Sequence, residues 1–146
     1  MTVRYDRPET WLAIHGFLVA FVWEMFQMPF FEMGDLSVRQ VTMNCALASF
    51  GDAGIMVAAY LAASWFAGDR RWLARPGWAS LAAYLANGQA ITIAVEILAV
   101  RVPWGWSYSS LMPRIMGVGL VPVVMWIVVP LIALGLTSRS VGPSAG

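Results

Sequence analysis

Charged residues are scarce in this chain. Asp, Glu, Lys and Arg make up 12% of its 146 residues, whereas hydrophobic residues make up 60%. A soluble domain has about twice that charged fraction, so the composition excludes an ordinary soluble globular protein. The formal net charge is only +1. This balance gives no reason to expect nucleic acid or another polyanion as a partner.

Residues that bind metals are almost absent, because the chain contains one cysteine, Cys45, and one histidine, His15. A single cysteine excludes an intrachain disulfide. Zinc sites and iron–sulfur clusters need several Cys or His ligands, so no metal site is predicted within one chain, and no cofactor. His15 is expected on the helix face opposite Glu24, hydrogen-bonded to a neighbouring helix. No nucleophilic triad is expected there.

Long apolar blocks are what the chain has in abundance. Four of them have about the 20 residues that a helix needs to cross a bilayer. The sequence therefore predicts an all-α polytopic integral membrane protein, a single domain of four transmembrane helices with the lipid bilayer as its partner. Because small residues let helices approach closely in lipid, the second span is expected to be the most enclosed. The predicted spans are 10–31, 41–67, 78–100 and 115–136.

The arginines predict the orientation. Four spans place both termini and the second loop on one side of the membrane, with six of the nine arginines. Cytoplasmic loops carry an excess of basic residues, so both termini are predicted in the cytoplasm. That side holds Arg4, Arg7, Arg70, Arg71, Arg75 and Arg139, and the other side holds Arg39, Arg101 and Arg114.

Three acids lie inside the predicted spans: Glu24, Asp52 and Glu96. An isolated acid near the bilayer centre costs on the order of 3 kcal/mol on insertion scales, so such groups are usually paired or face a polar cavity. At about 1.5 Å per residue, all three can meet in the outer half of the bundle. We predict that they form one acid–base cluster. Crowded carboxylates cannot all ionise cheaply, so at least one is expected to keep its proton near neutral pH.

Polar side chains share helix faces with these acids. Positions three or four apart lie on one face of a helix, and polar faces in membrane helices point inward. The aromatic loop before the fourth span is expected to cap the resulting pocket, with Arg114 as the counter-charge of one acid. An alternative is that the polar groups only hold helices together through hydrogen bonds. The predicted ligand-binding residues are Gln27, Ser49, Gln89, Thr92, Trp104, Tyr108 and Arg114.

Several segments carry resemblances to known proteins. WEMFQMPFF (23–31), GDA (51–53), Glu96, WSYSSLMP (106–113) and GVGLVPVVMW (117–126) together resemble a group of small bacterial four-span membrane proteins. That likeness covers nearly the whole chain and implies no activity. WEMFQMPFF alone is similar to one helix of the emopamil-binding and sigma-2 receptor family. Those four- or five-span proteins use membrane-buried acids to bind amphipathic amines or isomerise sterols, and the likeness covers one helix only.

Three classes of function remain open from the sequence. The first is binding or conversion of a lipophilic small molecule by acid–base chemistry, as in an isomerase or cyclase of isoprenoids. The second is a small proton-coupled transporter, since acids and proline-broken helices are common in such proteins. The third is an accessory subunit of a larger membrane complex, or a homo-oligomer whose small-residue helix is a contact surface.

Reporter fusions test the predicted orientation. A reporter at the N-terminus and one at the C-terminus should both give a cytoplasmic signal, because four spans return the chain to its starting side. An external signal from the C-terminal fusion would contradict this topology and would move the acids to the inner leaflet.

Overall fold

Four long helices make up most of the computed structural model, which describes residues 7–141. They are α1 (Pro8–Gln27), α2 (Val38–Ala67), α3 (Trp78–Ala99) and α4 (Leu120–Ser140). Each is long and apolar enough to cross a membrane. Two short 3-10 helices, η1 (Met28–Phe30) and η2 (Trp72–Ala74), follow α1 and α2.

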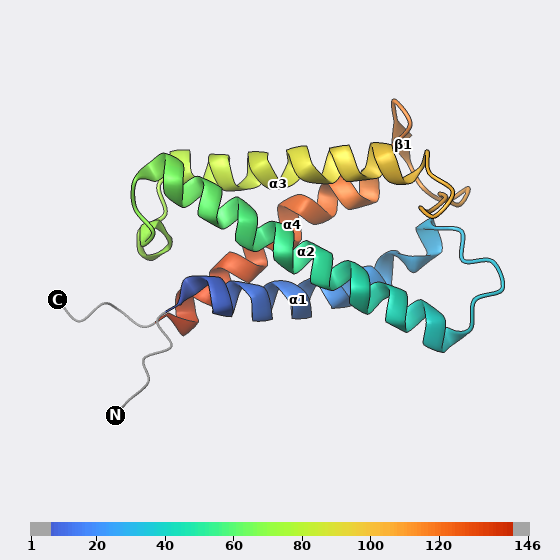
Figure 1. Ribbon diagram of the computed structural model, residues 1–146, viewed down its shortest axis with the longest axis horizontal. Coiled ribbons are helices and arrows are strands. Elements are labelled where there is room, and N and C mark those ends of the chain that lie inside the picture. Colours follow the sequence, from blue (N-terminus) through green and yellow to red (C-terminus); the bar gives the residue numbers. More distant parts are fainter. Residues whose placement is uncertain (1–6, 142–146) are drawn as a thin grey trace.

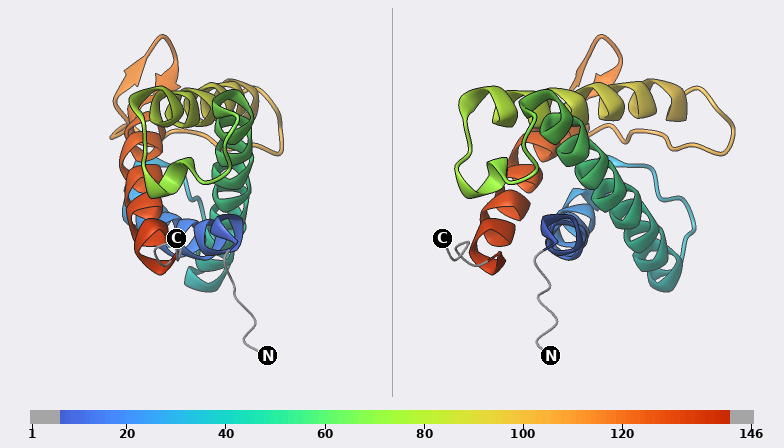
Figure 2. Two further views of the ribbon diagram at one scale, coloured as in Figure 1. Left: turned by 90° about the vertical axis from the view of Figure 1, so that its left-hand side faces the viewer. Right: turned by 60° about the vertical axis from the view of Figure 1, so that its left-hand side comes forward.

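The helices form a bundle with a roughly square cross-section (Figure 2). Each packs against its neighbours in the chain, and α4 returns to pack against α1. The start of α1, the α2–α3 connection and the end of α4 lie at one end, here called the inner end (Figure 1). The α1–α2 and α3–α4 connections lie at the opposite, outer end.

Each observed helix overlaps its predicted span, but α1 ends four residues earlier than predicted, α4 ends four residues later, and the largest difference is at the start of the fourth span. That span was predicted to begin at residue 115, but α4 begins at Leu120. In between, β1 (Arg114–Ile115) pairs antiparallel with β2 (Val118–Gly119). Met116 and Gly117 both have positive φ angles and reverse the chain between the strands. Apolar composition alone does not distinguish such a hairpin from a turn of helix.

Local sequence signals account for the ends of α2. The Ser37 hydroxyl accepts a hydrogen bond from the Gln40 backbone N–H, and the Gln40 side chain accepts one from the Ser37 backbone N–H. This capping box satisfies two donors that the first turn would leave free. At the other end Gly68 has a φ of 65°, a left-handed conformation that suits glycine and ends the helix.

The apolar core lies where the four helices converge in the middle and the inner half of the bundle. Leu12, Met56, Tyr60 and Val129 are almost completely buried there, and each belongs to the same apolar cluster. The core extends into η2, whose Trp72 donates a hydrogen bond from Nε1 to the Ser64 hydroxyl at 3.0 Å. This folded-back segment closes the bundle at its inner end.

The prediction that the second span is the most enclosed was wrong. In α4, 44% of the most apolar stretch is buried, against 33% in α2. The reason is that α4 packs against α1, α3 and η2, whereas a Cβ added at Gly51 or Gly54 of α2 would meet no atom of the described chain within 4 Å. Gly51, Gly54 and Ala58 are exposed on that surface.

Gly88 and Gly51 make a matched pair for testing the helix packing. An alanine Cβ at Gly88 would lie 2.7 Å from Cε3 of the buried Trp126, but at Gly51 it would meet nothing within 4 Å. Both glycines lie inside helices, so both substitutions gain about 0.5–1 kcal/mol of helix propensity. We expect Gly51→Ala to keep or raise the unfolding temperature in detergent.

Gly88→Ala should instead lower the free energy of unfolding by about 1–3 kcal/mol, the usual cost of overpacking. Equal tolerance of the two substitutions in the same melting assay would show that α3 and α4 do not pack as described.

Candidate functional site

Glu24 and Gln27 form the first part of the candidate site, in the last turns of α1. Gln27 is buried and donates a hydrogen bond from Nε2 to Oε1 of Glu24 at 2.7 Å. Its Oε1 accepts a hydrogen bond from Nε1 of Trp23 at 2.9 Å. The three residues are three and four positions apart, so the helix itself places them side by side. Trp23 therefore fixes one end of the Gln27 amide, and the other end of the amide orients Glu24.

Glu96, in the last turn of α3, is the most buried of the three acids, with 5% of its surface exposed. Its Oε2 accepts hydrogen bonds from the Tyr108 hydroxyl and, at 3.3 Å, from Nε1 of Trp106. The Tyr108 hydroxyl also accepts the backbone N–H of Gly119 at 3.2 Å. The α3–α4 connection is therefore tied to a buried carboxyl group.

Asp52 lies near the middle of α2, with a buried Oδ2 that has no hydrogen-bond partner in residues 7–141. The same holds for Oε1 of Gln89 and the hydroxyl of Thr92 on α3. The amide of Gln89 is held at its other end, where Nε2 donates to the Val123 carbonyl at 2.8 Å. Buried polar atoms in proteins nearly always have a partner, so such atoms mark where water or a ligand's polar group would bind.

The three carboxyl groups lie within electrostatic range of one another. Asp52 lies within this range of both Glu24 and Glu96, and Glu24 lies within it of Glu96. In the described part of the chain, however, no three Cys, His, Asp or Glu side chains are close enough together to hold a metal ion.

The outer end of this region is covered by the two outer connections. Phe31 and Tyr108 form an isolated antiparallel bridge, and the Ser109 backbone N–H donates to the Phe30 carbonyl at 3.0 Å. The Ser109 hydroxyl donates to the Pro29 carbonyl at 2.8 Å. These bonds join the segment after α1 to the segment before α4 above the acids. On the inner side, the apolar core separates the acids from the other end of the bundle.

Three predicted site residues have different surroundings from those expected. Arg114 makes no ion pair with the three acids, and its exposed guanidinium lies over the Tyr108 ring, 5.7 Å from the centroid. The expected counter-charge is thus wrong, since the hairpin turns Arg114 outward. Trp104 is 83% exposed, so its ring does not line a buried pocket. Ser49 is buried but donates within its own helix, to the Cys45 carbonyl at 2.7 Å.

Trp106 was missed as a site residue. It lies in the same aromatic loop as Trp104 and Tyr108, and the sequence contains no periodicity that would favour one tryptophan over the other. In the structure it is Trp106 whose indole Nε1 donates a hydrogen bond to Glu96. Trp106 lies two residues before Tyr108, which forms the backbone bridge to Phe31.

His15 is held apart from the acids, as expected. Its Nδ1 lies 3.2 Å from the Thr137 hydroxyl on α4. That hydroxyl already donates its hydrogen to the Ala133 carbonyl at 2.7 Å. Nδ1 therefore carries the proton of the His15–Thr137 bond. The prediction that His15 bonds a neighbouring helix is confirmed.

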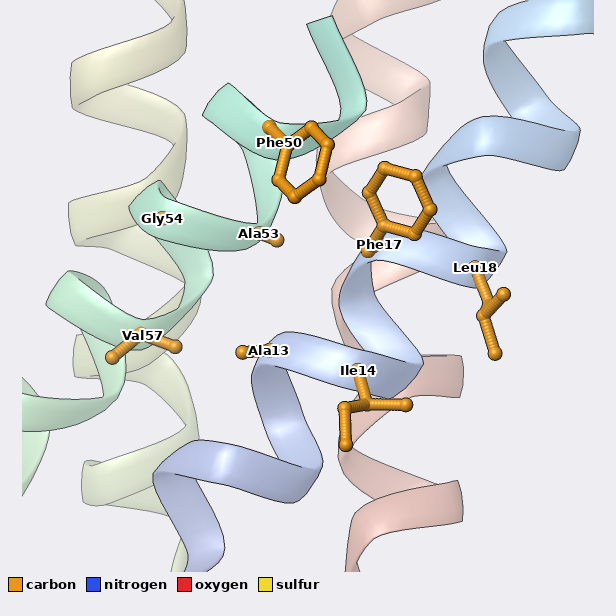
Figure 3. A pocket seen from close by; sticks show the side chains of 8 residues that line it. All are labelled: Ala13, Ile14, Phe17, Leu18, Phe50, Ala53, Gly54 and Val57. Atoms are coloured by element: carbon orange, nitrogen blue, oxygen red, sulfur yellow. The ribbon is translucent and has the colours of Figure 1, made fainter. Parts of the chain in front are cut away.

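A lateral groove opens on the outside of the bundle between α1 and α2 (Figure 3). Phe17 and Phe50 face each other across it, with ring centroids 4.5 Å apart. Phe17 and Glu24 are seven positions apart on α1, so they lie on the same helix face. The groove has a volume of about 530 Å³ and a wholly apolar lining, formed by Ala13, Ile14, Phe17, Leu18, Phe50, Ala53, Gly54 and Val57.

Comparisons with known proteins do not extend this description. No family model matches the chain, and no curated protein or solved structure shows significant similarity to it. The resemblances noted in the sequence therefore stay predictions.

Tyr108 lies outside the candidate spans, and its titration tests the contact with Glu96. Burial, and after it the hydrogen bond to Glu96, raise the pKa of the Tyr108 phenol from 10.0 to about 12. Ultraviolet difference absorbance between the wild type and Tyr108→Phe should show this phenol ionising about two pH units above an ordinary tyrosine.

The linked effect on stability has a defined sign. Because the folded state holds this proton more tightly, the contribution of Tyr108 to stability is complete below pH 10 and is lost as the pH rises toward 12. Ionisation near pH 10 in the folded protein would contradict the hydrogen bond to Glu96.

Proposed function

We propose that this chain is a multi-pass protein of a bacterial inner membrane that binds or converts a lipophilic small molecule at Glu24, Asp52 and Glu96. The observations that carry the proposal are the positioned carboxyl groups of Glu24 and Glu96 and the buried oxygens of Asp52, Gln89 and Thr92, which have no hydrogen-bond partner among residues 7–141. Ionisable groups inside membrane-spanning bundles are costly and usually functional. Two of the acids are held by dedicated donors, which is typical of positioned groups.

The proposed orientation places both termini in the cytoplasm. The arginines of the described chain favour this side, since the inner end carries more of them. The inner end has Arg7, Arg70, Arg71, Arg75 and Arg139, whereas the outer end has Arg39, Arg101 and Arg114. The acids then lie in the leaflet that faces away from the cytoplasm.

The roles of the acids follow from their partners. Oε2 of Glu96 accepts two hydrogen bonds, so this carboxyl group is fixed in place and suited to hold a negative charge. Oδ2 of Asp52 has no hydrogen-bond partner in the described part of the chain and is available to a ligand. One carboxylic acid can give a proton to a carbon–carbon double bond. A neighbouring carboxylate then takes a proton from an adjacent carbon, and the double bond moves by one position. Protons balance in this isomerisation, and it needs no oxidant.

The groove between α1 and α2 supports a ligand with a hydrocarbon portion. Its lining is wholly apolar and it opens on the apolar outside of the bundle (Figure 3). Because Phe17 shares its helix face with Glu24, a chain in the groove would run along α1 toward the acids. Isoprenoid-like molecules combine such a chain with a reactive double bond.

An accessory subunit of a larger complex is the second candidate. It is favoured by the exposed surface of α2 with Gly51, Gly54 and Ala58, since small residues are enriched where membrane helices pack closely. A proton-coupled transporter has less support, because the apolar core with Leu12, Met56 and Val129 separates the acids from the inner end.

Native mass spectrometry of the protein in mild detergent tests the proposal. The wild type should retain a lipophilic molecule, and Asp52→Asn and Glu96→Gln should each lower its occupancy at least about tenfold, since a hydrogen bond to a charged group contributes about 1.5–3 kcal/mol. Glu32→Gln, an exposed acid in the α1–α2 connection, is the matched control and should leave occupancy unchanged.

Melting curves of the same variants show whether each one is folded. A folded wild type that carries no small molecule, but co-purifies with a stoichiometric protein partner, would refute the proposal in favour of the accessory subunit.

A further inference from the structure

The hairpin of residues 114–119 leaves the bundle sideways. In Figures 1 and 2 it extends past α3 at the outer end, across the direction of the helices rather than along it. Its ladder pairs Arg114 with Gly119 and Ile115 with Val118, and the Leu120 backbone N–H donates to the Pro113 carbonyl at 2.8 Å at its base. If α1–α4 cross a membrane, the hairpin lies parallel to the membrane surface at the outer side.

Met116 stands at the tip of this hairpin in an unfavourable conformation. Its φ is 51°, and among the described non-glycine residues it alone has a positive φ. Two-residue hairpin turns with positive φ at both central positions strongly favour Asn or Asp before Gly, because these residues tolerate the left-handed region. Here a methionine precedes Gly117, and its side chain is 99% exposed. In water, this residue combines backbone strain with full exposure of an apolar side chain.

The neighbours of Met116 are also apolar and exposed. Ile115 is 59% exposed and Leu111 is 64% exposed, and Trp104 is exposed in the preceding part of the same connection. Arg114, at the base of the hairpin, presents a guanidinium group held over the Tyr108 ring. Tryptophan and arginine are the residues typical of the lipid headgroup level, where an aromatic ring meets apolar chains and a cation meets phosphate.

The backbone of the hairpin fixes how deep it can lie. The ladder provides hydrogen-bond partners for backbone groups of the paired strand residues. The turn at Met116 and Gly117 has further polar backbone groups outside that ladder. Such groups cannot enter the hydrocarbon core without a partner. They can be hydrated at the boundary between headgroups and acyl chains, where the Met116 side chain still reaches apolar surroundings.

We propose that the 114–119 hairpin inserts into this boundary of the outer leaflet, with Met116 and Ile115 among the upper acyl carbons and Arg114 at the lipid phosphates. The partner is the phospholipid bilayer itself. The insertion anchors the loop whose Tyr108 holds Glu96. This inference rests on the proposed membrane-spanning arrangement but not on any ligand of the acids.

Fluorescence quenching in lipid nanodiscs tests the insertion. In a Cys45→Ser background, single cysteines replace Met116, Ile127 or Asp35, one per protein, and carry an environment-sensitive fluorophore. Ile127 is an exposed apolar residue in the middle of α4, and Asp35 is exposed in the other outer connection. The nanodiscs contain phosphatidylcholine with bromine atoms on the upper acyl carbons, which quench only fluorophores within the bilayer.

The expected result is at least about a twofold loss of fluorescence at position 116 relative to unbrominated lipid, close to the loss at position 127, and little loss at position 35. Such a ratio corresponds to contact with acyl chains rather than exposure to water. Quenching at 127 without quenching at 116 would overturn the hairpin inference alone. No quenching at 127 would overturn the membrane-spanning arrangement and the inference with it.

Discussion

A carboxyl group buried among apolar helices needs hydrogen-bond donors, and the outer half of this protein is arranged around that requirement. Glu96 receives its donors from Tyr108 and Trp106, which belong to the connection that leads into α4. Gly119 lies against the Tyr108 ring so closely that a Cβ there would be 3.0 Å from Cε1. The hydrogen bonds of one buried carboxyl group thus connect the loop, the hairpin and the start of α4.

The two ends of the bundle are built differently as a consequence. The inner end is closed by apolar packing and by ordinary surface contacts, such as the 2.5 Å ion pair between Arg70 and Glu9. The outer end is held by hydrogen bonds to Glu24 and Glu96. Nearer the middle of the bundle, Asp52 has a buried oxygen without a hydrogen-bond partner among residues 7–141. Burial of polar groups without partners costs free energy, so this arrangement favours a ligand or water at that point.

The fold was largely predictable because length and hydropathy specify membrane helices directly, and the helical period placed Gln27 beside Glu24 and Thr92 beside Glu96. The sequence did not predict the hairpin, because Met116 takes a backbone conformation that its residue type disfavours. It also misplaced Arg114 and overlooked Trp106, because loop conformation decides where those side chains point. The enclosure of α2 was overestimated, since small residues permit close packing but do not provide a neighbour.

The central claim is that the three acids form one coupled site. A double-mutant cycle with Glu24→Gln and Glu96→Gln measures this directly through the free energy of unfolding in detergent, because glutamine keeps the shape and the acceptor oxygen of each acid. If the acids are coupled, the coupling energy between Glu24 and Glu96 should be about 0.5–3 kcal/mol. In a control cycle, Glu9→Gln and Glu96→Gln lie at opposite ends of the bundle, and their effects should be additive within about 0.5 kcal/mol. Additivity in the first cycle would contradict the account and would leave each acid as a separate structural residue.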